Sequence, residues 1–345
     1  MNSSEPFYQL QANLTQTFDG PNWTFDPCFA LCVLASALST TSSVLYLFIH
    51  DRSIVTPFTI FFLNLLIANL MLCIFFYPFF LVDQLYLTWP IGNSSCTLYQ
   101  YSAWVIAGAL CNTHALIALN RFWAVYFPDS YRRKHKKKLA FYICLGMWIY
   151  LNVGCLPGVI LDHLWYRPPV EIKGCNFVTD APASWLWTVQ LVYFDFPILL
   201  VLGVYPLVCW KAIKRVRRTI RPVNEGLSET AARQVSSLPQ ATDAAKSPNG
   251  PHQARPNVGR CFQFELRGVG RGVPVLSAMT LMVLIVYFPD QLAYTLQMML
   301  DVNIDPVLPV VSKLYLLSTI LDPVMFVLTV KKVRQTFRRV YFCGL

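Results

Sequence analysis

Seven apolar stretches constrain this chain most, because each is long enough to cross a bilayer as a helix. A spanning helix needs about 20 mostly apolar residues. The chain is 55% hydrophobic and 13% charged, which is too apolar for a water-exposed globule of 345 residues. The sequence therefore predicts an all-α membrane protein, a seven-transmembrane helix bundle. The stretches cover about residues 28–49, 57–82, 97–120, 139–161, 185–210, 273–300 and 306–330.

Outside the apolar stretches, composition divides the chain into a tail, a helical domain, one long loop and a C-terminal segment. Residues 1–26 are polar and contain neither Lys nor Arg nor an apolar core, so no cleavable signal peptide is predicted. Residues 27–345 form the helical domain. Within it, 221–270 is rich in Pro, Ser, Ala and Gln and is predicted to be a disordered third inner loop. Residues 331–345 place apolar side chains on one helical face among basic ones, which predicts a short amphipathic eighth helix before the C-terminus.

The basic residues fall almost entirely on one side of the predicted bundle. Six lie in 132–138, six in 211–221 and five in 331–339, whereas the opposite loops contribute only Arg167 and Lys173. The positive-inside rule places the N-terminus outside the cell. The net charge of +10 is thus explained without a nucleic-acid partner. Both anionic membrane lipids and a cytoplasmic protein partner fit the inner basic clusters.

Four Asn-X-Ser/Thr sequons test this orientation independently of the charges. All fall on the predicted outside, so we expect glycosylation there. They begin at Asn2, Asn13, Asn22 and Asn93.

A single arginine closes the third apolar stretch, in the run Asn120-Arg121-Phe122. One interpretation is that Arg121 reaches along the helix to the membrane interface, and the other is that it has a function. The run resembles the Asp-Arg-Tyr region of rhodopsin-like (class A) G protein-coupled receptors. Asn64 and Asn69 similarly resemble the family's Asn-Leu-Ala-X-X-Asp-Leu motif in the second stretch.

Further motifs carry the resemblance into the later stretches. Pro197 and Tyr205 have the spacing of the family's helix-5 proline and the tyrosine that turns towards the helix-3 arginine on activation. Tyr287 and Pro289 resemble the Cys-Trp-X-Pro segment. Asp322-Pro323 followed by Phe326 resembles the Asn-Pro-X-X-Tyr segment.

The departures from the family pattern gather in its activation switch. Asn69 replaces the aspartate that helps to bind sodium, which puts that site in doubt. Asn120 cannot offer Arg121 the ion pair of an aspartate, so we hypothesise raised basal activity. Thr41, Phe122, Tyr287 and Phe326 also depart from the family residues.

The resemblance implies a plasma-membrane receptor that binds an extracellular ligand and activates a heterotrimeric G protein, with arrestin as a further expected partner. Arg121 would bridge the inner ends of the third and sixth helices at rest and reorganise towards Tyr205. A weakly coupling or scavenger receptor of the same fold is the first alternative. A transporter is the second, although no internal repeat is visible. We find no enzyme motif, cofactor motif or metal-ligand spacing. We expect His114 to be a packed, hydrogen-bonded side chain rather than a ligand.

The ligand is expected in the outer half of the bundle, in a cavity with aromatic walls and a few polar groups. Two interpretations are open for Lys313 and Asp290: they form a structural ion pair, or one or both bind a charged group of the ligand. Amine receptors carry an aspartate where Ala103 stands, and opsins carry the retinal lysine where Leu316 stands, so a peptide or lipid is favoured over a monoamine. The candidate ligand residues are Tyr101, Trp104, Tyr193, Asp195, Asp290, Tyr294 and Lys313.

Most of the eleven cysteines lie in apolar stretches and are expected to be small buried hydrophobes. Cys96 and Cys175 differ, because both lie on the predicted outside, where oxidation is allowed. We predict a disulfide between them. Cys343 follows the amphipathic segment and is a palmitoylation candidate, although that segment also fits a simple membrane stop.

Overall fold

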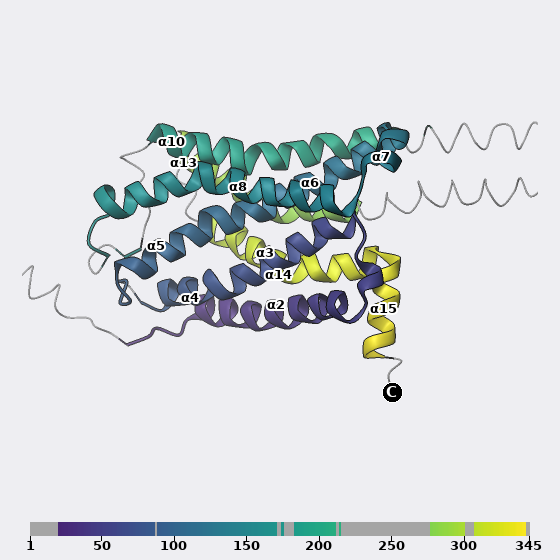
Figure 1. Cartoon of the computed structure of the whole chain (residues 1–345). Coiled ribbons are helices and arrows are strands. Elements are labelled where there is room, and N and C mark those ends of the chain that lie inside the picture. Colours follow the sequence, from purple (N-terminus) through teal and green to yellow (C-terminus); the bar gives the residue numbers. More distant parts are fainter. Residues whose placement is uncertain are drawn as a thin grey trace, which may run out of the picture.

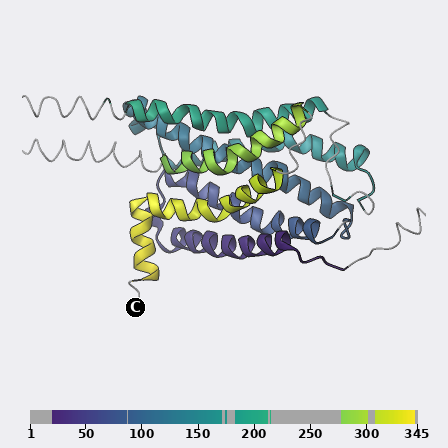
Figure 2. The ribbon, with the colours of Figure 1, turned by 180° about the vertical axis from the view of Figure 1, so that it is seen from behind.

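The computed structural model describes residues 20–86, 88–170, 174–175, 183–211, 214, 277–300 and 307–342. The predictions made for Asn2, Asn13, the 221–270 loop and Cys343 lie outside these residues. Within them, seven helices are long and apolar enough to cross a membrane, which confirms the predicted bundle. Figures 1 and 2 show these helices side by side along one common direction.

The first four spanning helices lie within a few residues of their predicted ranges. The first is α2 (Phe25–His50), and the second joins α3 (Thr59–Phe75) to α4 (Tyr77–Leu85). The third joins α5 (Asn93–Tyr101), the wide turn η2 (Ser102–Ile106) and α6 (Ala107–Tyr126). The fourth joins α8 (Lys137–Leu161) to the wide turn η3 (Asp162–Tyr166).

The last three spanning helices complete the bundle. The fifth covers Ser184–Lys211 and includes α10 (Ala183–Val189) and η4 (Gln190–Asp195). The sixth covers Ser277–Met298 and includes η5 (Val283–Tyr287) and α13 (Phe288–Leu300). The seventh is α14 (Leu308–Thr329). In the described part of the chain, three short helices lie outside the spans: η1 (Arg52–Ile54), α7 (Pro128–Lys134) and α15 (Lys331–Tyr341).

The third helix is the centre of the bundle. In its most apolar window 72% of residues are buried, against 28% in the first and fourth helices. The helix also continues to Tyr126, past the expected end near residue 120. Arg121 does not end it, because a charge near a helix end is compatible with helical backbone, whereas Pro128 removes a backbone donor and begins α7 instead.

The C-terminal helix α15 turns away from the bundle after Val330, which has extended backbone angles. Its Val333 is fully buried, and Phe337 and Val340 pack against the main core, as the apolar face predicts. The Thr336 hydroxyl donates to the Asp51 carboxylate at 3.1 Å. Hydrogen bonds from Ser53, with a smaller one from Thr336, lower the pKa of Asp51. Polar contacts with Asp51, the residue before η1, therefore hold α15 against the bundle.

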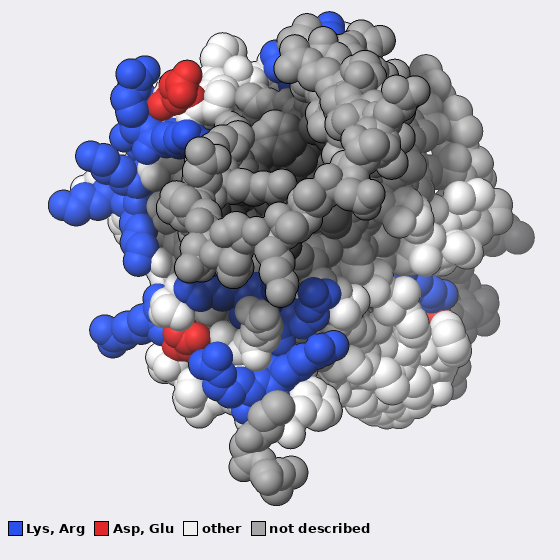
Figure 3. All heavy atoms as spheres, turned by 90° about the vertical axis from the view of Figure 1, so that its right-hand side faces the viewer, with Lys and Arg blue, Asp and Glu red and all other residues white. Residues whose placement is uncertain are grey.

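Lys and Arg side chains gather at the end of the bundle that carries α7 and α15, as Figure 3 shows. The described ones come mainly from residues 132–138 and from α15. The start of α5, the helix that contains Cys96, lies at the opposite end of the spans (Figure 1). The charge asymmetry read from the sequence is thus an asymmetry between the two ends of the folded bundle.

Candidate functional site

Arg121, near the end of α6, lies against an aromatic ring. Its guanidinium carbon is 3.3 Å from the centroid of the Phe58 ring, at the start of the second helix. No Asp or Glu of the described residues forms an ion pair with it, and its Nε has no hydrogen-bond partner. A cation over an aromatic face contributes about 0.5–2 kcal/mol, which is weaker than a desolvated ion pair. Within the described part of the chain, Arg121 is therefore held by an aromatic ring rather than by a carboxylate.

Asn120, its neighbour, is held by α7 and the residue that follows it. The Asn120 amide nitrogen lies 2.7 Å from His135 Nε2, and the Tyr131 hydroxyl donates to the Asn120 carbonyl oxygen at 3.2 Å. The rings of Tyr131 and His135 stack with their centroids 4.2 Å apart. We call Asn120, Tyr131 and His135 the Asn120 clasp.

The clasp is neutral at physiological pH. Burial, with a smaller effect from the Arg121 charge, lowers the pKa of His135 to about 4. Burial also raises the pKa of Tyr131. The unprotonated imidazole accepts the hydrogen bond from the Asn120 amide, and the phenol keeps the proton that it donates. The clasp thus holds α7 to the third helix through neutral hydrogen bonds alone.

The expected resting bridge from Arg121 to the sixth helix is not visible, because the described part of that helix begins at Ser277. The contact that the structure gives Arg121 is with the second helix. Tyr205 donates to the Ser277 hydroxyl at 3.3 Å and so joins the fifth helix to the sixth. Its movement towards Arg121 stays a prediction. Phe122 stacks on Tyr126 with centroids 4.4 Å apart.

In the middle of the bundle, Asp322 of α14 faces two residues from other helices. The Tyr287 hydroxyl donates to Asp322 Oδ2 at 3.0 Å, and His114 Nε2 lies 3.3 Å from Asp322 Oδ1. The His114 ring meets the Tyr287 ring edge to face at 5.0 Å. His114 is packed as expected, but neither ring nitrogen has a hydrogen-bond partner of good geometry within the described ranges. Both polar atoms of Asn69 also lack a hydrogen-bond partner among these residues.

The residues that replace the family's aromatic groups remain at the core. Phe326 stacks on Phe62 at 4.4 Å and on Phe48 at 5.9 Å, so it fastens the seventh helix to the first two. Pro289 lies in α13 after the wide turn η5, and Pro323 lies inside α14. Proline inside a helix removes one backbone hydrogen bond, which gives both helices a weak point beside Tyr287 and Asp322.

In the outer half, a chain of polar side chains joins the fifth, sixth and seventh helices. Gln190 Nε2 lies 3.3 Å from the Asp195 carboxylate and donates to Gln291 Oε1 at 3.0 Å, and Gln291 donates to Asp290 at 3.0 Å. Ser312 also donates to Asp290, at 3.2 Å. No Lys, Arg or His among the described residues pairs with either carboxylate.

Of the two interpretations of Lys313 and Asp290, the structural ion pair does not occur among the described residues, and the role in binding a charged ligand group stays a prediction. Lys313 Nζ lies 2.7 Å from Asp26 Oδ1 at the start of the first helix. The two side chains are 30% and 42% exposed, so both charges stay partly in contact with water. Asp290 is 2% exposed, and pairing Lys313 with it would require desolvation of the ammonium group, which is costly.

The aromatic candidates for the ligand site divide into separate groups. The Tyr101 hydroxyl donates to Asn152 of the fourth helix at 3.0 Å. Trp104 contacts Phe194 edge to face, and the Tyr193 ring packs against the Tyr150 ring in a tilted arrangement, with centroids 4.5 Å apart. These three therefore contact the fourth and fifth helices, whereas Asp290 is bonded to Ser312 of the seventh. Tyr294 of α13 is 43% exposed.

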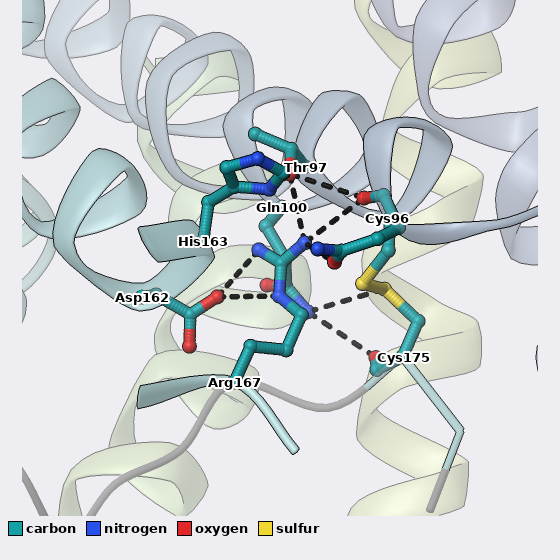
Figure 4. Close-up of polar contacts among 8 residues, drawn as sticks. Cys96, Thr97, Gln100, Asp162, His163, Arg167 and Cys175 are labelled. Carbon is teal, nitrogen blue, oxygen red and sulfur yellow. Dashed lines mark hydrogen bonds and ion pairs between the residues drawn. A yellow bond between two sulfur atoms is a disulfide. The ribbon is translucent and has the colours of Figure 1, made fainter. Parts of the chain in front are cut away.

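The outer end of the bundle is cross-linked, as Figure 4 shows. Cys96 and Cys175 form the expected disulfide, and the Gln100 amide donates to the Cys175 carbonyl at 3.2 Å. Arg167 Nε donates to Asp162 at 2.7 Å, and both side chains are 1% exposed. The other arm of Arg167 donates to Asn93 Oδ1 and to Thr97, each at 2.8 Å. We call Arg167, Asp162, Asn93 and Thr97 the outer clamp.

Comparison with known proteins decides the family. A family model described as 7 transmembrane receptor (rhodopsin family) matches residues 41–326, which is most of the chain. The chain belongs to the rhodopsin receptor family. This confirms the family resemblance, and since these are receptors, it also confirms that the chain is not an enzyme.

Individual relatives of the receptor are distant. Human melatonin receptor type 1B is 26% identical over 209 residues, which cover 59% of this chain and 56% of that protein. Human melanopsin is 25% identical over 207 residues, covering 59% of the receptor and 43% of melanopsin. The D(1C) dopamine receptor of Xenopus laevis is 24% identical over 229 residues, covering 63% and 44%. The matches thus span about half the length of these relatives.

Sequence reasoning missed two polar groups of the receptor. In the outer clamp, Arg167 was counted only as an outer-loop charge, although Asp162 stands five residues before it, at the end of an apolar stretch. In the Asn120 clasp, His135 lies within a run of Lys and Arg residues, and no sequence periodicity indicated a contact between His135 and Asn120.

Pro128 was the available signal. It begins the short helix α7, which brings Tyr131 and His135 back against the third helix.

Proposed function

We propose that this receptor lies in the plasma membrane with its N-terminus outside and converts binding of an extracellular ligand into activation of a heterotrimeric G protein. The observation that carries the proposal is the state of Arg121, which is part-buried against the Phe58 ring near the basic end of the central helix and has no carboxylate partner among the described residues. A switch needs two packings within a few kcal/mol of each other. The Arg121–Phe58 contact and the neutral hydrogen bonds of the Asn120 clasp are each weak, so little free energy is needed to exchange them for the contacts of a second packing.

Charge and sequon positions support the orientation. The end with α7 and α15 carries the Lys and Arg clusters, which favour the cytoplasm. Asn22 and Asn93 are exposed at the other end. Arg167 uses the Asn93 carbonyl oxygen, and the amide nitrogen to which a glycan attaches makes no bond to the described residues. Glycosylation at Asn93 is therefore compatible with an intact outer clamp. The cationic clusters are also expected to contact anionic lipids, and the same end would receive arrestin.

For the ligand, we favour a peptide or lipid over a monoamine. Ala103 offers no charge to an amine, and Leu316 cannot link retinal as a lysine would. Among the described residues, Asp195 and Asp290 accept hydrogen bonds only from amides and hydroxyls. Asp290 is buried and Asp195 is part-buried, so a cationic group, which peptides carry, would stabilise both carboxylates. This supports a peptide with a basic group, received between the fifth, sixth and seventh helices.

The decisive experiment measures nucleotide exchange on a purified G protein by the receptor in lipid nanodiscs. Without ligand, we expect measurable exchange, because Arg121 has no acidic partner among the residues that the structure describes. The variant Asn120→Asp supplies one, and a charged hydrogen bond is about twice as strong as a neutral one, so basal exchange should fall. Asp129→Asn, an exposed change on α7, is the matched control and should leave exchange unaltered.

Three outcomes separate the alternatives. Exchange that Asn120→Asp does not lower would contradict the hypothesis of raised basal activity. If a ligand from a screened library binds but causes no nucleotide exchange on any G protein tested, a scavenger or weakly coupling receptor would be favoured. Uptake of the ligand into sealed vesicles would favour a transporter.

A further inference from the structure

A cavity of about 340 Å³ opens on the outside of the bundle, between the third, fourth and fifth helices. We call it the lateral groove. It lies in the membrane-spanning part, and its walls are apolar except at Asn112 and the Tyr150 hydroxyl. Its main lining residues are Asn112 and Leu116 of α6, Gly146 and Tyr150 of α8, and Val192 and Phe196 of the fifth helix.

The lateral groove faces the bilayer rather than the bundle interior. Phe196 is 60% exposed, and Tyr150 and Leu119 on its rim are also exposed. Within a spanning segment such side chains contact hydrocarbon, because no water reaches them. Whatever fills the groove therefore comes from the lipid phase and is largely apolar.

Asn112 adds one polar requirement. Its amide nitrogen donates to the Gly108 carbonyl at 2.9 Å and to the Tyr193 carbonyl at 2.8 Å. Its carbonyl oxygen accepts no hydrogen bond from any described residue. An acceptor left unsatisfied in hydrocarbon costs free energy, and one hydroxyl donor would remove that cost. The occupant should carry such a donor.

The depth of Asn112 in the bilayer limits which lipid molecules can bring a hydroxyl donor to its carbonyl oxygen. Asn112 precedes Arg121 by nine residues. At about 1.5 Å per helical residue it lies about 13 Å further into the bilayer, whose apolar core is about 30 Å thick. Head-group hydroxyls of ordinary lipids stay at the interface. A hydroxyl reaches this depth when it stands at the end of the molecule that points to the bilayer centre.

We propose that the lateral groove binds a sterol hydroxylated in its side chain, with the hydroxyl donating to the Asn112 carbonyl oxygen. The rings of Tyr150 and Phe196 and the rigid Pro197 give the groove flat walls, which suit fused rings better than a flexible acyl chain. The volume falls in the range of small-molecule sites. Because Asn112 also holds the Tyr193 carbonyl in η4, the bound sterol stabilises the contact between the third and fifth helices.

Photolabelling of the full-length receptor in phosphatidylcholine nanodiscs tests this site. A photoreactive sterol with a side-chain hydroxyl should label peptides from α6, α8 and the fifth helix. The same probe without that hydroxyl should label about fivefold less, the effect of one neutral hydrogen bond of about 1 kcal/mol.

Two glycine variants localise the label. A Cβ at Gly146 would meet nothing within 4 Å, so Gly146→Leu is compatible with the fold while its side chain fills the groove. Labelling should be lost. Gly203→Leu is the matched control, since Gly203 also faces open space in the fifth helix but does not line the groove. The Gly203→Leu receptor should be labelled by the sterol as strongly as the unaltered receptor.

Several results would overturn the proposal. These are equal labelling by the two sterols, unchanged labelling of Gly146→Leu, or equally strong labelling by a photoreactive phosphatidylcholine. A cross-linked receptor dimer through this face, abolished by Gly146→Leu, would instead assign the lateral groove to a second copy of the chain. The comparison of the two sterols on the unaltered receptor decides the proposal even if the variant folds poorly.

Discussion

The two ends of the third helix are held by different kinds of interaction. At the outer end, Cys96 is covalently bound to Cys175, and Arg167 pairs with Asp162 where both side chains are 1% exposed. At the inner end, Arg121 rests on the Phe58 ring, and Asn120 is held by neutral hydrogen bonds from α7. Covalent and buried ionic links fix one end, whereas contacts of about 1 kcal/mol hold the other.

This difference locates the rigid and movable parts of the receptor. A ligand changes an equilibrium only through its different affinity for the two states, so the inner contacts must be weak enough to be exchanged. The outer end, in contrast, has to keep the loop that carries Cys175 beside the third helix. The following predictions test this contrast, from the largest expected effect to the smallest.

Breaking the outer clamp should have the largest effect on stability. Asp162→Asn leaves Arg167 buried without its counter-charge, and loss of one partner of a buried pair costs about 3–5 kcal/mol. Thermal unfolding in detergent should show a clearly lower midpoint than for Asp129→Asn, which removes an exposed carboxylate. Equal midpoints would mean that the clamp does not stabilise the outer end.

Removal of the disulfide should have the next largest effect. Cys96→Ser with Cys175→Ser opens a link across 79 residues, and loss of such a bond costs about 2–4 kcal/mol. The unfolding midpoint of the purified double variant reports the loss. Cys209→Ser, which removes a free cysteine of the fifth helix, should leave the midpoint unchanged.

At the inner end, Tyr131→Phe should change activity more than stability. It removes the hydrogen bond to Asn120 and costs the resting clasp about 1 kcal/mol, which corresponds to about fivefold higher basal nucleotide exchange if α7 is released on activation. Tyr142→Phe, on an exposed tyrosine of α8, is the control. Basal exchange that does not rise would show that the clasp is structural only.

The clasp should also make the receptor sensitive to acid. The pKa of His135 is about 4 in the folded protein, below its ordinary value of about 6.5. The unfolded chain therefore binds the proton more readily, and the stability contributed by the neutral imidazole is lost as pH falls from about 6.5 towards 4. His135→Gln should flatten the decline of the unfolding midpoint between about pH 7 and pH 5. If the unfolding midpoint declined identically in the unaltered receptor and in His135→Gln, groups other than His135 would cause the acid sensitivity.

The exposed pair of Lys313 and Asp26 should have the smallest effect. Both side chains remain partly in water, and such pairs contribute about 0–1 kcal/mol. Asp26→Asn should move the unfolding midpoint only slightly, and high salt should remove the difference. A large shift would show that the first and seventh helices depend on this pair more than its exposure suggests.

Much of the site could be predicted from local pattern. The positions of Arg121, Pro289, Asp322 and Pro323 follow from short motifs inside apolar stretches, and the disulfide followed from two cysteines on the same outer side. The partners of charged groups could not be predicted in this way. A pair with Asp290 was one of two interpretations of Lys313, which contacts Asp26 instead, because solvation at that end of the bundle favours the exposed carboxylate.

The sequence by itself determined the seven crossings, the charge asymmetry of the ends and the family, because hydropathy, charge count and motifs are local properties of the chain. Only the tertiary structure decided that Arg121 meets Phe58, that His135 bonds to Asn120, and that a groove opens beside Asn112. Those contacts join residues of different helices or fold a loop back on its helix. Their formation depends on how the helices pack, which no single stretch encodes.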